Sequence, residues 1–126
     1  DDGGTPLMVA CEHGHLECVQ LLRDAGAGIN QAMNDGATPL FMACQNGHLE
    51  CAQLLLEAGA AINQAEENGA TPLLIACQKG RLDIVRLLIE ASAAVSQALN
   101  DGATPLYIAC QQGHVACAQL LLEAGA

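Results

Sequence analysis

The sequence predicts an all-α solenoid, in which antiparallel helix pairs stack side by side and are joined by short loops that resemble β-hairpins. The first observation is a fixed period: Thr-Pro-Leu begins at Thr5, Thr38, Thr71 and Thr104, always 33 residues apart. The second is that a glycine and a Leu-Leu pair recur at the same offsets in every copy. Such a period is typical of a repeat array, in which about three or more units are needed for a stable core.

The first helix of each unit is marked by its start and its end, as the second copy shows. Thr38 can cap a helix with its hydroxyl oxygen. Pro39 follows at the first helical position, where the missing N–H costs nothing. Gly47 interrupts the apolar pattern eight residues later. We therefore expect a short helix over about residues 39–46.

The second helix of the unit is expected over roughly residues 49–58. Glu50 lies in its first turn, where the positive end of the helix dipole favours an acid. Its leucines follow helical spacing and give an apolar face too wide for one hairpin to cover, so neighbours on both sides should cover it. Gly59 should end the helix in a left-handed conformation.

The loops between helix pairs carry strong tight-turn signals at Asp35-Gly36, Asn68-Gly69 and Asp101-Gly102. They should project as short hairpins from one edge of the stack. No linker or composition shift interrupts the chain, which predicts one domain over residues 1–126. The chain begins without Met and stops at the end of a helix pattern, so we expect a fragment of a longer array. The expected repeats are about 1–34, 35–67, 68–100 and 101–126.

The net charge of the chain limits the classes of partner that we expect. The formal net charge is −10, with only four basic residues. Nucleic acid would be repelled, because phosphate binding depends on clustered Lys and Arg. Anionic membrane surfaces are disfavoured for the same reason, and no apolar run approaches the ~20 residues of a membrane helix. We expect a protein or peptide partner, of basic or polar character.

Seven cysteines occupy two repeat positions, which argues against a disulfide framework. One position in the third copy is filled by Ile84, so a small apolar core residue suits it, and free cysteine packs in that way. Reduced thiols indicate a cytoplasmic or nuclear compartment. The cysteines are Cys11, Cys44, Cys77 and Cys110 at the first position, and Cys18, Cys51 and Cys117 at the second.

Cys44, His48 and Cys51 have side chains that ligate zinc or form a nucleophile–base pair. Gly47 breaks the helix between the first two, and the third copy has arginine and isoleucine at the equivalent places. We interpret the pattern as core cysteines and a turn histidine that bonds to loop carbonyls. We assign no catalytic residue, metal ligand or cofactor.

The repeated residues resemble the ankyrin repeat. The strings Gly-Ala-Thr-Pro-Leu, Ala-Cys, Gly-His-Leu-Glu and Leu-Leu-Leu-Glu-Ala-Gly-Ala carry the resemblance, which covers the whole chain. It implies a curved solenoid with hairpins at right angles to the helices, no activity, and a passive protein-binding surface. The family usually has His after Thr-Pro-Leu, and apolar contacts should replace its hydrogen bonds here, at Met8, Phe41, Leu74 and Tyr107.

The resemblance places the candidate contact residues at the hairpin tips and at the ends of the inner helices. Glu66 and Glu67 form the densest acidic pair, which either attracts a basic peptide or is a solvated turn. Met33 and Leu99 are apolar loop residues for which we expect solvent exposure. The tip candidates are Met33, Asn34, Asp35, Glu66, Glu67, Asn68, Leu99, Asn100 and Asp101. The polar residues expected to line the groove are Gln45, Asn46, Gln78, Lys79, Gln111 and Gln112.

The leading functional interpretation is a non-catalytic protein-interaction module that uses the hairpin tips and the concave inner-helix face. The alternative is a designed or consensus-like scaffold without a natural partner, because residues 35–60 and 101–126 differ at only five places. The first and last copies also keep the apolar sequence of internal repeats. Since terminal repeats usually carry a polar outer face, end-to-end association is expected.

Overall fold

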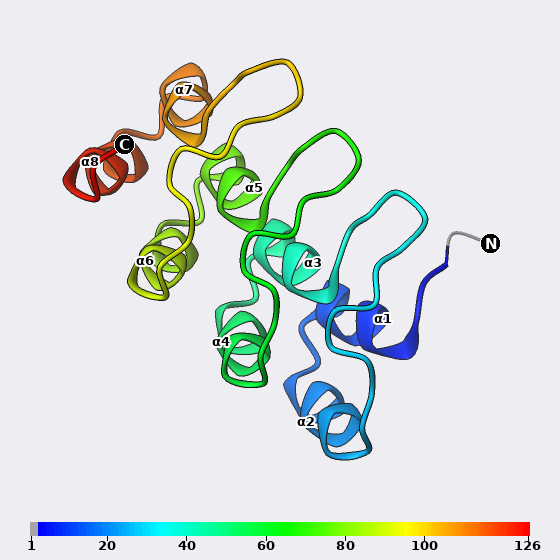
Figure 1. Cartoon of the computed structure of the whole chain (residues 1–126). Coiled ribbons are helices and arrows are strands. Elements are labelled where there is room, and N and C mark those ends of the chain that lie inside the picture. Colours follow the sequence, from blue (N-terminus) through cyan, green and yellow to red (C-terminus); the bar gives the residue numbers. More distant parts are fainter. Residues whose placement is uncertain (1–2) are drawn as a thin grey trace.

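The computed structural model describes residues 3–126, whose eight helices form two rows (Figure 1). Within each row successive helices pack against one another, and the two helices of each repeat also pack together. The predicted solenoid is confirmed. The inner row is α1 (Pro6–His13), α3 (Pro39–Asn46), α5 (Pro72–Lys79) and α7 (Pro105–Gln111); the outer row is α2 (Leu16–Asp24), α4 (Leu49–Glu57), α6 (Leu82–Glu90) and α8 (Val115–Glu123).

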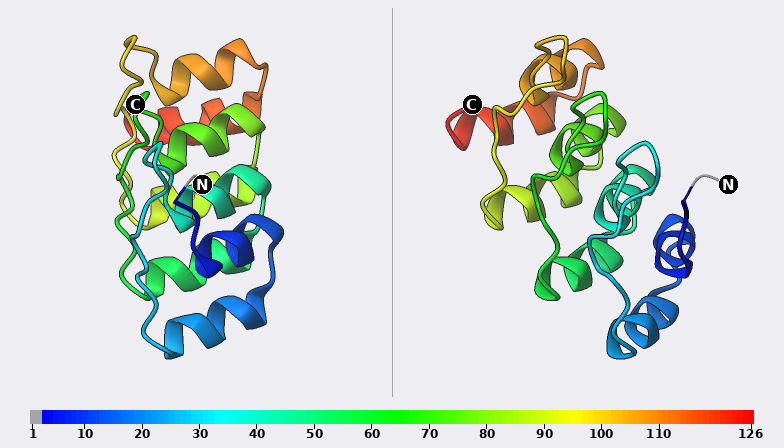
Figure 2. Two further views of the ribbon diagram at one scale, coloured as in Figure 1. Left: turned by 90° about the vertical axis from the view of Figure 1, so that its right-hand side faces the viewer. Right: turned by 45° about the vertical axis from the view of Figure 1, so that its right-hand side comes forward.

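The helices lie across the long axis of the stack, and the loops between repeats gather along one edge (Figure 2). The tight turns within each helix pair lie at the opposite edge. The α1–α2 pair forms one end of the stack and the α7–α8 pair forms the other (Figure 1). Each internal repeat therefore has a neighbour on both sides, whereas each end repeat of the described part has one.

Every inner helix begins with the predicted cap. The hydroxyl oxygen of Thr71, for example, accepts a hydrogen bond from the Leu74 amide at 3.1 Å. Pro72 follows at the first helical position. Thr38 and Thr71 are both buried, so the cap satisfies their hydroxyls where water cannot.

Three of the four outer helices are followed by a glycine in the left-handed conformation, such as Gly59 with φ of 94°. The backbone then turns back, and the Ala60 amide donates to the Leu55 carbonyl at 2.9 Å. In the third repeat Ser92 takes this place with φ of 71°. A side chain in this conformation costs roughly 1–2 kcal/mol.

A side chain at the start of α4, α6 and α8, three of the four outer helices, bonds its repeat to the one before. His48 Nε2 lies 3.0 Å from the Glu12 carbonyl oxygen in the last turn of α1. In the third repeat Arg81 does the same, its Nη2 donating to the Gln45 carbonyl at 3.1 Å. The turn histidine does bond to a main-chain carbonyl, but the predicted loop acceptor is wrong, because the acceptor lies at the end of an inner helix. Such carbonyls lack partners within their own helix.

The core runs through the whole stack and contains most of the cysteines. Cys11, Cys44 and Cys77 are fully buried between the helix rows. Burial raises the pKa of Cys11 and Cys77 to about 12, with a smaller contribution from the neighbouring thiol of Cys51 or Cys117. All seven cysteines are free thiols.

The expectation that every cysteine is a core residue is wrong for two of them. Cys18 and Cys110 are exposed. Each occupies a position that is buried in internal repeats, but it lies in an end repeat on the side without a described neighbour. The burial of the residue after Thr-Pro-Leu also depends on the neighbouring repeat. Met8, Phe41 and Leu74 are buried, whereas Tyr107 in the last repeat is 60% exposed.

Replacing Ser92 with glycine should raise the free energy of unfolding by about 0.5–1 kcal/mol, because the left-handed strain is relieved at some cost in chain entropy. Urea denaturation followed by circular dichroism measures this. Ser96→Gly is the control, because the φ of Ser96 is not positive, and it should give no gain. An unchanged or lower stability of Ser92→Gly would show that the left-handed conformation of Ser92 does not destabilise the fold.

Arg81→Ala should lower the free energy of unfolding by about 1 kcal/mol, the value of one net hydrogen bond. Arg81→His should stay within about 0.5 kcal/mol of the parent, since imidazoles make the same bond at the other two junctions. Arg86→Ala is the control, because Arg86 only approaches the exposed Asp83 at 3.8 Å. If Arg81→Ala and Arg86→Ala lowered the free energy of unfolding equally, the hydrogen bond of Arg81 to the Gln45 carbonyl would not stabilise the junction between these repeats.

In dilute native protein a thiol reagent should modify Cys18 and Cys110 quickly and the buried cysteines only on unfolding. The raised pKa of Cys11 and Cys77 keeps these thiols protonated, and so unreactive, even at pH 9. Mass spectrometry of the labelled peptides identifies the sites. The Cys18→Ser/Cys110→Ser double variant should lose the fast phase, and rapid labelling of Cys77 would show that the core opens.

Candidate functional site

The hairpin tips are tight three-residue turns. In the first tip the Met33 amide donates to the Ala37 carbonyl at 2.8 Å, and the Gly36 amide donates to the Met33 carbonyl at 2.9 Å. Gly36 has φ of 90°, which favours glycine. The Asp35 carboxylate accepts from the Ala37 amide at 3.0 Å. Asn68 and Asp101 make the same bond in the next two tips, so these three candidates shape the turns.

The tips are joined into one continuous edge by hydrogen bonds between neighbours. The Glu67 amide donates to the Asp35 carbonyl at 2.8 Å, and the Asn100 amide donates to the Asn68 carbonyl at 2.9 Å. The Asn100 side-chain amide also donates to the Glu67 carbonyl at 2.7 Å. A Cβ on Gly69 would lie 2.7 Å from the Asn100 nitrogen, so glycine permits this approach. A partner would therefore contact one continuous edge in which hydrogen bonds fix the positions of the tips.

The expectation that Met33 and Leu99 are solvent-exposed is wrong, whereas their role as contact residues stays a prediction. Both are half-buried and pack against the hydrophobic core. Each is the first residue of its turn, so the chain reversal directs its side chain back over the helices. The same position in the middle tip is Glu66, which is also half-buried. One carboxylate therefore occupies a place that its neighbours fill with apolar side chains.

The surroundings of Glu66 disfavour its ionised form. Burial raises the pKa of this carboxyl above its ordinary value, and the charges of Asp35 and Glu67 raise it further. A hydrogen bond with the Asn68 side chain acts in the opposite direction and is outweighed. The middle tip thus concentrates negative charge that no ion pair recorded in residues 3–126 neutralises. The sequence already indicated this site, because Glu66 occupies the repeat position that holds Met33 and Leu99 in the other tips.

The candidates at the ends of the inner helices form a second group, away from the tips. The tips precede the inner helices, whereas these residues end them, and about eight residues of helix correspond to roughly 12 Å. The two groups lie at opposite edges of the stack, as the views in Figure 2 show. Exposed side chains of this second group are Gln78, Lys79, Gln111 and Gln112; Gln45 and Asn46 are half-buried.

Part of the second group is committed to the fold. The Asn46 side-chain amide donates to the Met42 carbonyl of its own helix at 3.0 Å. The main-chain carbonyls of Gln45 and Gln78 accept from the next repeat, from Arg81 and His114. Lys79 is exposed and carries a charge opposite to that of the middle tip. Within the helix-end group, the Asn46 side-chain amide is therefore engaged in the fold, whereas the cited bonds of Gln45 and Gln78 use main-chain oxygens.

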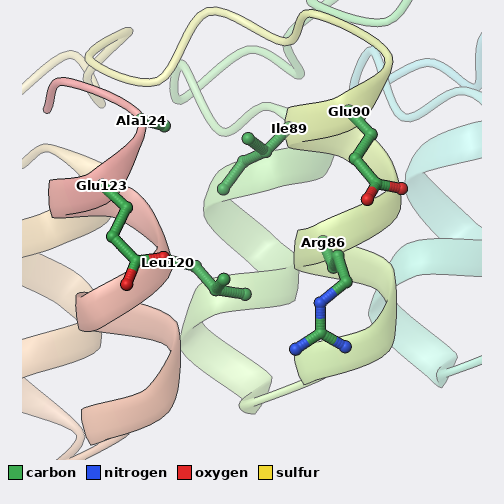
Figure 3. Close-up of a pocket in the computed structure, with 6 residues that line it drawn as sticks. All are labelled: Arg86, Ile89, Glu90, Leu120, Glu123 and Ala124. Atoms are coloured by element: carbon green, nitrogen blue, oxygen red, sulfur yellow. The ribbon is translucent and has the colours of Figure 1, made fainter.

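A shallow pocket of about 250 Å³ lies on the outer helix row, between α6 and α8 (Figure 3). Ile89 and Leu120 line it from facing helices, and charged side chains surround them. Its residues follow the ordinary outer-helix pattern, so nothing in the sequence distinguishes this place. The residues around it are Arg86, Glu90, Glu123 and Ala124.

The cysteines and histidines do not converge on a metal site. Within residues 3–126, no group of three His, Cys, Asp or Glu side chains is placed to hold a metal ion. His48 and His114 turn toward helix-end carbonyls of the preceding repeat. No helix in the described part of the chain is long and apolar enough to span a membrane.

A family model described as ankyrin repeats in three copies matches this chain twice, over residues 1–66 and 58–126. The two matches together span the whole chain, and the stacked helix pairs described above are consistent with an ankyrin solenoid. No curated protein matches the chain. The chain therefore belongs to the ankyrin-repeat family.

Proposed function

We propose that this protein binds a basic peptide or protein segment through its middle hairpin tip, as a non-catalytic interaction module. Ankyrin repeats are in general protein-interaction modules and are typically non-catalytic. The observation that carries the proposal is the carboxylate of Glu66 at a position where both neighbouring tips have apolar side chains. Ionisable groups with a perturbed pKa occur preferentially at functional sites.

The charges around the middle tip favour a cation. Asp35 and Glu67 both raise the pKa of Glu66, so a Lys or Arg side chain placed there would relieve the repulsion among three carboxylates. The hydrogen bonds between tips hold these groups in place before a partner arrives. Pre-organisation reduces the entropy lost on binding. The net charge of −10 adds long-range attraction for a basic partner.

The inner-helix ends are proposed as a secondary contact area. Gln78, Lys79, Gln111 and Gln112 are exposed there and offer hydrogen-bonding groups. A partner that also reached the tips would have to cross the inner helices, over roughly 12 Å. We propose further that residues 1–126 act as one binding domain and that the compartment is cytoplasmic or nuclear. We also propose that the two end faces of the stack associate with each other.

A consensus-like scaffold without a natural partner is the second candidate. It is favoured by the similarity of the outer tips, Met33-Asn34-Asp35 and Leu99-Asn100-Asp101, and by the identical glutamines at 45, 78 and 111. The middle tip differs from both of these, with Glu66-Glu67-Asn68 in the same place. Selective binding that depends on Glu66 would therefore distinguish an interaction module from a scaffold.

Glu66→Leu should weaken the binding of a fluorescent penta-lysine peptide by about two- to fivefold, because exposed ion pairs contribute up to about 1 kcal/mol. Fluorescence anisotropy in low salt measures the affinity. Leucine is native at the equivalent place in the next tip, so the fold should be retained. Glu90→Gln is the matched control: it removes the same charge from the exposed outer row and should have little effect.

The pH dependence has a defined sign. Since the pKa of Glu66 is raised, this carboxyl takes up its proton at a higher pH than an ordinary glutamate does on acidification. Binding of the peptide should therefore weaken as pH falls through that raised pKa, and Glu66→Leu should remove this part of the pH dependence. Equal affinities of Glu66→Leu, Glu90→Gln and the parent protein would favour the scaffold.

A further inference from the structure

The middle hairpin tip has asparagine before its glycine, whereas both neighbouring tips have aspartate at that place. An asparagine followed by glycine can lose ammonia from its side chain, because the nitrogen of a residue without a side chain can closely approach the side-chain carbon of the asparagine. The surroundings of this asparagine therefore decide whether its amide group persists. The pairs are Asn68-Gly69 in the middle tip, and Asp35-Gly36 and Asp101-Gly102 in the tips beside it.

The carbonyl group of the Asn68 side chain is polarised by a main-chain amide. Its oxygen Oδ1 accepts a hydrogen bond from the Ala70 amide at 3.0 Å. The bond spans Gly69, so it holds the side-chain carbonyl close to the main chain of that residue. When a nucleophile attacks the carbon of this group, negative charge develops on the oxygen. A donor that is already in place stabilises that charge, as in the oxyanion hole of an enzyme.

The nitrogen of the same side chain lies beside an acid. The Asn68 side-chain amide forms a hydrogen bond with the Glu66 carboxyl group. Burial and the charges of Asp35 and Glu67 raise the pKa of this carboxyl, so it carries a proton more often than an ordinary glutamate does. A departing amide nitrogen must take up a proton to leave as ammonia. Glu66 is placed to supply that proton.

The attacking nitrogen has to be released from one hydrogen bond. The Gly69 amide donates to the Glu66 carbonyl at 2.8 Å, the bond that closes the turn. A single bond of this kind at a loop tip opens far more readily than the whole fold. The Asn68 side chain is exposed, so water reaches it for the later hydrolysis.

We infer that Asn68 is a self-modification site, at which the folded tip converts this asparagine into an acid. The Gly69 nitrogen bonds to the side-chain carbon of Asn68 and loses its proton to water, which closes a succinimide ring. The bond between that carbon and the side-chain nitrogen breaks, and the nitrogen leaves as ammonia with the proton of Glu66. Water then opens the ring to aspartate or isoaspartate, and Glu66 regains a proton from solvent.

A second Asn-Gly pair, Asn46-Gly47, has different surroundings. The Asn46 side-chain nitrogen donates to the Met42 carbonyl of its own helix at 3.0 Å. Its partner is a carbonyl oxygen rather than an acid, so this partner supplies no proton. Asn46 is also half-buried, whereas Asn68 is exposed. The same dipeptide therefore provides an internal comparison.

Aspartate at position 68 fits the tip without rearrangement. Asp35 and Asp101 make the same turn bond, each accepting from the amide two residues later at 3.0 Å. Isoaspartate instead lengthens the main chain before Gly69, where an added Cβ would already lie 2.7 Å from the Asn100 nitrogen. One product therefore adds a negative charge to the middle tip, and the other loosens this tip from the next.

Peptide mapping by mass spectrometry, after incubation of the folded protein at neutral pH, tests the site. Asn68 should be converted while Asn46 keeps its amide. Glu66→Gln preserves a hydrogen-bonding partner for Asn68 but removes the acid, so conversion should slow by about tenfold or more. Glu67→Gln is the matched control, because it removes the same charge one residue away, and its rate should stay close to that of the parent.

The same measurement in urea separates the effect of the fold from that of the dipeptide. In the unfolded chain Asn68 and Asn46 should react at similar rates, and Glu66→Gln should have no effect, because nothing holds the acid beside the amide. The inference is overturned if Asn46 reacts as fast as Asn68 in the folded protein, if neither reacts, or if folded Glu66→Gln reacts like the parent. These outcomes do not depend on whether the tip binds a basic peptide.

Discussion

The packing of each repeat against its neighbours is the constraint on which the rest of this structure depends. Neither the inner nor the outer helices can cover their apolar faces within one helix pair. Contacts along the two rows, α1 with α3 and α2 with α4 and so on, complete the core. Stability in such an array is nearly a sum over repeats and the junctions between them. The environment of a residue is therefore decided by the neighbours of its repeat as much as by its own sequence.

Polar bonds between repeats give these apolar contacts a fixed register. At the turn edge, imidazole or guanidinium groups reach the carbonyls at the end of the preceding inner helix. At the tip edge, main-chain amides donate to the carbonyls of the preceding tip. Both kinds of bond satisfy groups that would otherwise lack partners within the protein. The middle tip is held from both sides, and this places the Glu66, Glu67 and Asp35 carboxylates together.

The two edges of the stack have different capacities for recognition. The tip edge carries negative charge on turns that are joined by hydrogen bonds, and one of its carboxylates is half-buried. The turn edge offers glutamines and one lysine, but the Gln45 and Gln78 carbonyls bond to the next repeat and the Asn46 side chain bonds within its own helix. The end faces offer apolar surface. Charge, hydrogen bonding and hydrophobic contact are thus separated on this small molecule.

The sequence alone determined the period, the helix pairs, the caps and the turns, because each depends on residues close together in the chain. Thr38 and Pro39 begin a helix through local hydrogen bonding, and Gly47 ends it through local backbone geometry. The candidate tip residues were also predictable, since turns are locally encoded.

Only the tertiary structure decided which faces are covered. Cys18 and Cys51 share one repeat position, yet one is exposed and the other is buried, because burial depends on a neighbouring repeat far along the chain. The length of the inner helices separates the tips from the inner-helix ends, and packing against the core leaves Met33 half-buried. Local chemistry sets each unit, whereas contacts between units set its exposure and its electrostatic environment.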